Sequence, residues 1–354
     1  WNRGRLDGFV STHRETDDGS GPLTMGYYTR DDLPFYYALA DGYTILDGYH
    51  ASVMGPTYPN RYYWMSATND PNGVHGGPAI KNLKTRYSWE TYPERLQRAG
   101  VSWRIYHEQP EPGEPVGLNV ILNFAAFQDA TPTSPLYEYA VKSRAVDAML
   151  DDMRTGNLPH VSWIIPPYAF CEHPDMLPAA GENYVRQIVE ALTSNPTTWA
   201  KTAFIIVYDE NDGQFDHVLP PTPPLQTPDE YINGQPIGLG FRVPALIVSP
   251  FARGGYVCGD TFDHTSTLRL LETRFGVEVP NLSTWRRQTC GDMTSAFGFG
   301  EPIDASIAQL PQTATDLVVV EREILTLPRP SVPSLQVMPQ QEPGIRKRRG
   351  KQEA

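Results

Sequence analysis

The fold expected for this sequence rests on Thr-Ala-Phe-Ile-Ile-Val-Tyr (TAFIIVY, 202–208), followed at once by Asp-Glu-Asn-Asp-Gly (DENDG, 209–213). The first seven residues form an apolar run rich in strand-forming side chains, which is typical of a strand buried on both faces. The next four residues are polar, and three of these are acidic. In sheets of parallel strands, ligands bind just beyond the carboxyl ends of the strands. The two stretches together predict a buried strand with a polar site at its end.

Apolar runs alternate with amphipathic segments on both sides of this strand. Further strands are expected at VSWRIY (101–106), HVSWII (160–165) and VPALIV (243–248). Apolar residues at helical spacing predict helices over residues 93–99, 136–153, 182–192 and 264–275, and Gly156 and Gly276 mark helix ends. This alternation predicts an α/β fold with a mainly parallel central sheet covered by helices on both faces.

Composition excludes several classes of protein. The chain has 354 residues and a formal net charge of −12, which argues against a nucleic-acid-binding protein. No apolar run approaches the length of about 18 residues that a transmembrane segment needs. The 29 glycines and 34 prolines indicate ordered loops, above all at residues 214–240. Residues 327–354 are rich in Pro and Gln and then basic, so a disordered tail is expected there.

The acidic stretch after the strand is the strongest local signal for chemistry. Asp209 and Glu210 are adjacent carboxylates, and such neighbours repel each other unless a cation compensates. Hard divalent cations take oxygen ligands of this kind, so the pair is predicted to bind a divalent metal ion. An ordinary acidic surface turn is the alternative. His217 lies close enough in sequence to join the site, or is a plain loop histidine.

A second signal is YHASVMGPTYPNR (49–61), in which Gly-Pro-Thr resembles a tight turn entering a helix. Thr57 would lie at a helix N-terminus, where an anion is favoured. An N-cap and a nucleophile occupy the same kind of position, so these residues alone leave both roles open. The three cysteines also leave open whether Cys258 and Cys290 form a disulfide.

Three histidines form the third signal. His107 directly follows an expected strand, His173 lies a few residues past another, and His264 precedes an expected helix. A cleft with a metal ion, a hydroxyl group and several histidines suits phosphoryl chemistry, because the metal polarises the phosphate and a histidine protonates the leaving oxygen. The sequence contains no Walker motif, dinucleotide fingerprint or Gly-x-Ser-x-Gly elbow.

Six stretches together resemble the bacterial phosphoesterase family of phospholipases C and acid phosphatases, with the strongest likeness to mycobacterial-type phospholipase C. The resemblance covers residues 1–326, the expected catalytic domain, and its motifs occur in matching order. The stretches are MGYYTRDDLPFYYALAD (25–41), GYHASVMGPTYPNR (48–61), IYHEQ (105–109), FCEHP (170–174), VYDENDGQFDHV (207–218) and FDHTSTLRLLETRFG (262–276).

The resemblance implies an alkaline-phosphatase-like fold and assigns roles residue by residue. Thr57 corresponds to the nucleophile, which also contacts a single metal ion, and Asp209 and Glu210 correspond to metal ligands. His107 and His173 correspond to histidines near the transferred phosphate, one of them the leaving-group acid, and His264 to a further family histidine. The resemblance also implies secretion or attachment to the cell wall.

One departure from the family pattern affects these expectations. Family members begin with a secretion signal and a Glu-Asn metal-binding motif on the first core strand, and neither is found in this sequence. The chain is therefore expected to be truncated at its N-terminus, without one strand of the sheet and part of the metal site. An open apolar edge of the sheet would result.

Three hypotheses of function follow. The first is a phospholipase C that hydrolyses phosphatidylcholine, and also sphingomyelin, at a membrane surface. The second is a broad acid phosphatase that uses the same site. The third is a truncated, inactive remnant. For the choline head group, the aromatic residues Tyr58, Tyr62, Tyr63 and Trp64 are candidate contacts, with a packed aromatic helix face as the alternative.

Overall fold

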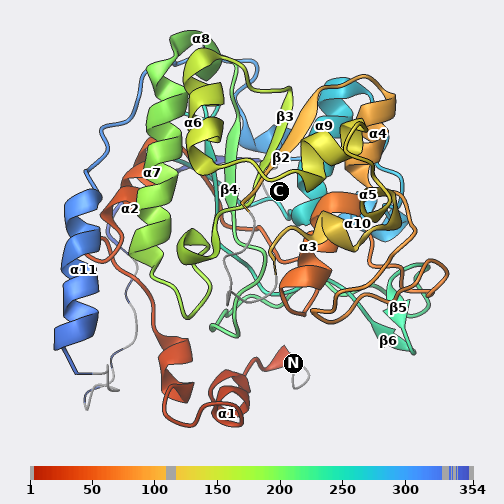
Figure 1. The fold of residues 1–354 in the computed structure, drawn as a ribbon. Coiled ribbons are helices and arrows are strands. Elements are labelled where there is room, and N and C mark those ends of the chain that lie inside the picture. The colour runs from red at the N-terminus through yellow and green to blue at the C-terminus, as the bar shows by residue number, and fades with distance from the viewer. Residues whose placement is uncertain are drawn as a thin grey trace.

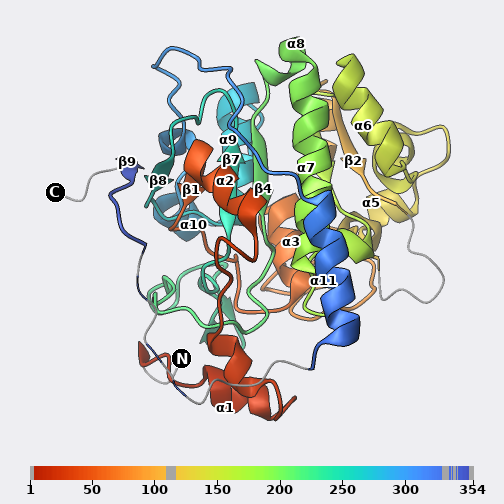
Figure 2. The same ribbon diagram turned by 90° about the vertical axis from the view of Figure 1, so that its left-hand side faces the viewer.

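The computed structural model describes residues 4–108, 117–328, 335, 337, 340 and 342–350. The strand expected at residues 202–208 is β4 (Phe204–Val207), which forms one edge of a five-stranded sheet of order β4-β7-β1-β8-β9. The other strands of this sheet are β7 (Ala245–Val248), β1 (Thr44–Leu46), β8 (Tyr256–Cys258) and β9 (Lys347–Arg349). Figures 1 and 2 show the sheet between its helices from two directions.

The sheet is mixed, which corrects part of the expectation. Four strands run in one direction, and β7 runs in the opposite direction between β4 and β1. Parallel neighbours need a long crossover, usually a helix, whereas antiparallel neighbours can be joined by a loop. The chain from β4 to β7 contains only loops and the small hairpin of β5 (Tyr231–Ile232) and β6 (Gln235–Pro236). It therefore returns to the sheet antiparallel.

Helices cover both faces of the sheet, as expected. Alternate side chains of β4 point to opposite faces, so Phe204 and Ile206 pack in one apolar cluster and Ile205 and Val207 in another. The first cluster is completed by α2 (Pro34–Gly42), α6 (Val146–Thr155), α7 (Pro178–Ser194) and α8 (Pro196–Trp199). The second includes residues of α9 (His264–Phe275). The structure thus confirms the α/β class.

A second, two-stranded sheet lies beside the first. It consists of β2 (Trp103–Tyr106) and β3 (Val161–Ile164), which pair in parallel. Its core includes residues of α3 (Thr57–Ser66), α4 (Tyr92–Arg98) and α5 (Ala125–Gln128). Within the described ranges, no strand joins β3 to β4, and all four side chains of β4 are only half-buried. A cavity separates the two sheets.

The helix expected over residues 136–153 is not continuous. The structure has a π-helical turn at Tyr137–Val141, and α6 begins at Val146. Between them, Arg144 donates its backbone N–H to the carbonyl of His107, so tertiary contacts interrupt the helical pattern. The other expected helices are present, and Gly156 and Gly276 end α6 and α9 with φ of 78° and 67°. Glycine adopts this left-handed conformation without steric strain.

The structure describes three further α-helices. They are α1 (Phe9–Arg14), α10 (Thr284–Thr289) and α11 (Ala314–Thr326), and α11 packs on α7. Among the described residues, no helix has the length and apolar character to cross a membrane. Cys171, Cys258 and Cys290 are free thiols, so the structure contains no bridge between Cys258 and Cys290.

Part of the expected disordered tail forms a strand. Lys347–Arg349 is β9, which pairs in parallel with β8 at the edge of the sheet. Arg349 binds Glu301 at 2.6 Å and lies over the ring of Tyr256, while Arg346 binds Asp41. Basic side chains of the tail thus form ion pairs with acidic residues of the preceding domain. Residues 329–334, 336, 338–339, 341 and 351–354 of the tail lie outside the described residues.

Candidate active site

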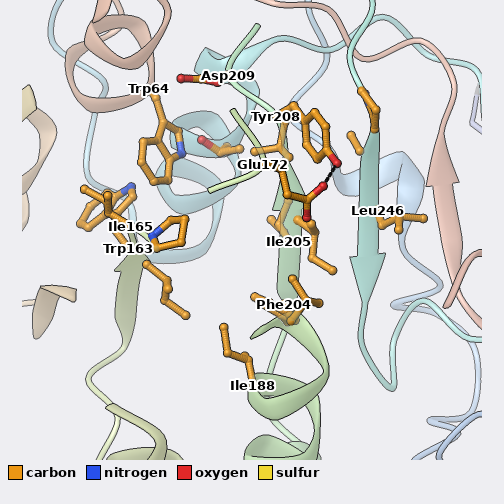
Figure 3. A pocket seen from close by; sticks show the side chains of 18 of the residues that line it. Trp64, Trp163, Ile165, Glu172, Ile188, Phe204, Ile205, Tyr208, Asp209 and Leu246 are labelled. Atoms are coloured by element: carbon orange, nitrogen blue, oxygen red, sulfur yellow. Dashed lines mark hydrogen bonds between the residues drawn. The ribbon is translucent and has the colours of Figure 1, made fainter. Parts of the chain in front are cut away.

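The cavity between the two sheets has a volume of about 2990 Å³. Four predicted site residues besides Asp209 line it: Thr57, His173, Glu210 and His264. Figure 3 shows Trp64 and Asp209 near one end, at the carboxyl end of β4, and the apolar Phe204 and Ile188 toward the other. These polar residues come from different elements: Thr57 begins α3, His264 begins α9, and Asp209 and Glu210 follow β4. The cavity therefore has a polar mouth and an apolar interior.

Thr57 is the first residue of α3, and its side chain is buried. The N-cap position belongs to Pro56, so the interpretation of Thr57 as a mere N-cap is wrong. Asn82 instead accepts a hydrogen bond from the backbone N–H of Tyr58 at 2.8 Å. Within the described part of the chain, the Thr57 hydroxyl forms no hydrogen bond. This hydroxyl is therefore available to a ligand in the cavity.

Asn60 holds the loop that presents Thr57. Its side-chain amide donates to the carbonyls of Gly55 and Pro56 at 2.9 and 3.2 Å, and its oxygen accepts from the N–H of Val53 at 3.0 Å. Asn60 is fully buried. Because a buried side chain with satisfied hydrogen bonds has little freedom, the backbone before Thr57 is fixed.

Asp209 and Glu210 lie at the end of β4, as predicted. Asp209 accepts a hydrogen bond from Nε of Arg61 at 2.7 Å, an ion pair that the sequence analysis did not anticipate. Arg61 is four residues after Thr57, so both lie on the same face of α3, and this spacing was the available signal. Burial raises the pKa of Glu210 to about 7, and the charge of Asp209 adds to the shift. A cation in the cavity would relieve this repulsion.

His173 lies at the mouth of the cavity with its imidazole about half exposed. Its Nδ1 lies 2.5 Å from Oδ1 of Asp175, and the hydroxyl of Tyr168 donates to the same carboxylate at 3.0 Å. A carboxylate on Nδ1 fixes the ring and leaves Nε2 for a substrate. Sequence reasoning missed Asp175, although an acid two residues after a candidate histidine was a visible signal.

His264 is buried and has partners on both ring nitrogens. Its Nε2 lies 2.8 Å from the backbone carbonyl of Asp209, and its Nδ1 lies 3.2 Å from the hydroxyl of Tyr49. A carbonyl only accepts, so Nε2 carries the proton and Nδ1 accepts from Tyr49. Burial lowers the pKa of His264, which keeps the ring neutral. These contacts support a role in holding the backbone of Asp209.

The structure does not bring His107 into this group. His107 is buried under the π-helical turn, where its Nε2 donates to the carbonyl of Ala140 at 3.0 Å, and it is absent from the described lining of the cavity. Burial lowers its pKa. His217 is also apart, with 77% of its side chain exposed. His107 directly follows β2, but its ring binds the carbonyl of Ala140, so a position after a strand does not by itself place a histidine in the site.

The comparison with protein-family models gives a match over residues 1–278 to the model described as "Phosphoesterase family". The match includes all the residues that line the polar mouth, from Thr57 to His264. The chain belongs to the phosphoesterase family. The resemblance drawn from the six motifs is therefore confirmed.

Curated relatives of this phosphoesterase bear the names of phospholipases C. It is 40% identical over 374 residues to "Non-hemolytic phospholipase C" of Pseudomonas aeruginosa, covering 98% of this chain and 52% of the relative. It is 42% identical over 375 residues to "Phospholipase C B" of Mycobacterium tuberculosis, covering 97% of this chain and 72% of the relative. The chain thus spans about half the length of the Pseudomonas protein.

Among solved structures, the comparison finds a member of the alkaline phosphatase superfamily from Vibrio parahaemolyticus. The identity is 12%, the TM-score is 0.41, and the match covers 77% of this chain and 64% of that chain. A second match is the phosphonate monoester hydrolase of Agrobacterium radiobacter, with 13% identity and a TM-score of 0.36, covering 76% of this chain and 73% of that chain.

The aromatic residues after Thr57 differ in their burial in this phosphoesterase. Tyr58, Tyr62 and Tyr63 are almost fully buried, so the packed helix face describes them correctly. Tyr62 contacts the rings of four neighbours, Tyr58, Tyr87, Trp89 and Phe124. Trp64 is only half-buried and lines the cavity close to Asp209 (Figure 3).

Phosphoesterases and alkaline-phosphatase-like enzymes generally use metal ions. In the described part of the chain, no group of three or more His, Cys, Asp or Glu residues has the geometry to hold one. Asp209 and Glu210 nevertheless supply two adjacent carboxylates; burial is the main cause of the raised pKa of Glu210, and the neighbouring charge of Asp209, which a cation would offset, adds to it. These two carboxylates are ligands of the kind that a hard cation takes, and water or phosphate oxygens would complete its coordination shell.

Proposed function

We propose that this chain carries the catalytic centre of a phospholipase C that hydrolyses phosphatidylcholine to diacylglycerol and phosphocholine, with sphingomyelin as a second substrate. The observation that carries the proposal is the Thr57 hydroxyl, which lines the same cavity as Asp209, Glu210 and His173 without a hydrogen bond inside the described part of the chain. The names of the relatives support the reaction class.

In the first step of this proposal, the Thr57 oxygen attacks phosphorus and the bond to the diacylglycerol oxygen breaks. His173 protonates the leaving oxygen through Nε2, because Asp175 occupies Nδ1. A phospho-threonine forms, and the threonine proton leaves to water. A divalent cation bound by Asp209 and Glu210 would lower the pKa of the Thr57 hydroxyl and polarise the phosphate.

In the second step, water attacks the phosphorus of the phospho-threonine. His173, now neutral, accepts the proton of that water, and the Thr57 oxygen leaves with a proton from solvent. Phosphocholine is released. Asn60 keeps Thr57 in place during both steps, since it holds the preceding loop by three hydrogen bonds.

The cavity also suggests how a lipid would be bound. Trp64 lies beside the polar mouth, where its ring can contact a quaternary ammonium group. The apolar wall formed by residues such as Ile188, Phe204 and Ile206 offers a surface for an acyl chain. We further propose that the protein acts outside the cell or in the cell wall, where such lipids are reached from a membrane surface.

Substitution of the proposed nucleophile tests the mechanism. We expect Thr57→Ala to lower kcat on a phosphocholine diester by about 1000-fold or more, because the covalent step is lost, while Thr57→Ser keeps measurable activity. The assay compares initial rates of the purified chain with and without added divalent metal. Thr284→Ala is the matched control, because Thr284 is the first residue of α10 and is exposed.

Near-normal turnover of Thr57→Ala would refute the phospho-threonine mechanism. Faster hydrolysis of phosphate monoesters than of phosphocholine diesters would favour the acid phosphatase. Lack of turnover by the unaltered chain, with every divalent metal tried, would favour the inactive remnant.

Binding of the metal can be tested without turnover. We expect Mg²⁺, Ca²⁺, Mn²⁺ or Zn²⁺ to raise the Tm of the chain in a thermal shift assay, since a ligand that binds the native state stabilises it. The shift should be lost in Asp209→Asn and Glu210→Gln. Asp151→Asn, on the exposed surface of α6, is the control that should keep the shift. An equal shift in all three variants would place the cation elsewhere.

A further inference from the structure

Glu172 joins the loop of His173 to the strand that leads into Asp209. One oxygen of its carboxylate accepts a hydrogen bond from the hydroxyl of Tyr36 at 2.5 Å. The other accepts from the hydroxyl of Tyr208, the contact drawn as a dashed line in Figure 3. Tyr36 belongs to α2, and Tyr208 lies between β4 and Asp209. The carboxylate therefore connects three separate parts of the chain.

The surroundings of Glu172 are shaped to admit this side chain. Glu172 has a φ of 58°, in the left-handed region that non-glycine residues seldom adopt. A Cβ at Gly181 of α7 would lie 2.1 Å from its Oε1 and 2.2 Å from its Cγ. Only glycine at position 181 leaves this space. A strained backbone conformation persists when the surrounding structure determines it, as the two phenols and α7 do here.

This connection bears directly on His173, the next residue. Asp175 orients the imidazole locally, but it belongs to the same loop and cannot place that loop against the rest of the site. His173 lines the same cavity as Glu210 and Asp212, although its loop follows β3 and the acidic stretch follows β4. The distance between the histidine and the acidic stretch therefore depends on a contact that spans the two, and Glu172–Tyr208 is such a contact.

We propose that Glu172 is a positioning residue, which holds the His173 loop against the end of β4 so that Nε2 of His173 meets the leaving-group oxygen of the substrate. The inference rests on the proposed function, because it presupposes His173 as the leaving-group acid. Burial raises the pKa of Glu172 to about 7, so the carboxyl is partly protonated at neutral pH. Both forms keep the contacts, because a phenol oxygen accepts as well as donates.

Leaving-group dependence separates this role from a general structural one. A nitrophenolate leaves without a proton, whereas the alkoxide of diacylglycerol needs one. We expect Glu172→Ala to lower kcat/KM, which reports the steps up to departure of the leaving group, by about 100-fold on phosphatidylcholine in mixed micelles and by less than about 5-fold on p-nitrophenyl phosphocholine. His173→Ala should show the same selectivity, and the double variant should be no slower than His173→Ala. Glu172→Gln should restore most of the activity.

Glu182→Ala is the matched control. Glu182 is a buried glutamate of α7 that accepts a hydrogen bond from the backbone N–H of Tyr36 at 2.9 Å, but within the described part of the chain none of its hydrogen bonds reaches the end of β4. Any damage from its loss should affect both substrates equally. Equal losses on both substrates for Glu172→Ala, or additive effects with His173→Ala, would overturn the inference.

Amide hydrogen exchange provides a readout that needs no turnover. We expect Glu172→Ala to accelerate exchange over residues 168–176 by about 10-fold or more and to leave α9 unchanged. Unchanged exchange over that segment would also overturn the inference. The proposed function fails on a different result, namely normal activity of Thr57→Ala, so the two failures are distinguishable.

Discussion

Three glutamates, of which Glu172 and Glu210 line the cavity, hold protons more tightly than an exposed carboxyl does. Burial raises the pKa of Glu172, Glu182 and Glu210 to about 7, against an ordinary value of 4.5. Each has a different set of partners: two phenols for Glu172, the backbone of α2 for Glu182 and the Asp212 N–H for Glu210. The region of the site is therefore sensitive to pH near neutrality.

Glu182 gives a prediction about stability. The native state keeps its proton up to about pH 7, and the unfolded state releases it near pH 4.5. Between these values the native state binds more protons, so the free energy of unfolding falls as pH rises through this window. Glu182→Gln removes this contribution. We therefore expect the difference in free energy of unfolding, variant minus wild type, to be larger at pH 8 than at pH 5 by on the order of 2 kcal/mol. Urea unfolding at pH 5, 6, 7 and 8 measures it, and parallel curves would contradict it.

At the scale of elements, a buried arginine joins α10 to the start of α9. Nε of Arg286 donates to Glu230 at 2.8 Å and Nη1 donates to Asp263 at 2.8 Å, and all three side chains are almost completely buried. Asp263 is the N-cap of α9 and also accepts a hydrogen bond from Ser52 at 2.9 Å. The helix that begins with His264 is thus anchored by a network of buried charges.

Removal of this arginine should be severe. Arg286→Ala would leave two buried carboxylates without their cation, and we expect a loss of about 3–5 kcal/mol of stability. Arg86→Ala is the control, because its pair with Asp129 is exposed to solvent and should contribute far less to stability. Chemical denaturation of both variants provides the comparison. Similar small losses in the two variants would contradict the anchoring role.

At the scale of the whole molecule, the site lies where two sheets face each other across a cavity. The five-stranded sheet contributes β4 with Asp209 and Glu210, and the two-stranded sheet contributes β3, which leads to His173. Within the described ranges, β4 pairs only with β7 and β3 only with β2. The two halves of the site are therefore joined by side chains, such as the Glu172–Tyr208 contact, rather than by a continuous sheet.

This arrangement predicts unequal protection of backbone amides. In an antiparallel pair, alternate residues direct their N–H groups to the partner and away from it. We expect alternate amides of β4 to exchange about 100-fold faster than the amides of β7, which is paired on both sides. Hydrogen exchange followed by NMR measures the difference. Uniform protection along Phe204–Val207 equal to that of Ala245–Val248 would contradict the open edge.

Several features could be predicted from short stretches of sequence because their causes are local. The apolar run before Asp209 formed a strand, and α9 ended at Gly276, whose left-handed conformation follows from the lack of a side chain. Thr57 was correctly expected at the start of a helix. Its catalytic role, like the roles of His173 and of the acidic pair, remains a proposal.

Other features were outside the reach of these local patterns. The direction of β7 depends on the path of a loop of more than thirty residues, which periodicity does not describe. The ion pair of Arg61 with Asp209 joins residues that are 148 positions apart in the sequence.

By itself, the sequence predicted the strands β2, β3, β4 and β7 and the helices α4, α7 and α9, the family to which the chain belongs and the residue types that follow the strand ends. Only the tertiary structure decided that His107 lies apart from the cavity, that His264 binds the backbone of Asp209 and that Lys347–Arg349 completes the sheet. The physical reason is that strand formation and helix caps depend on neighbours along the chain. The position of a side chain in a site depends instead on contacts between segments far apart in sequence.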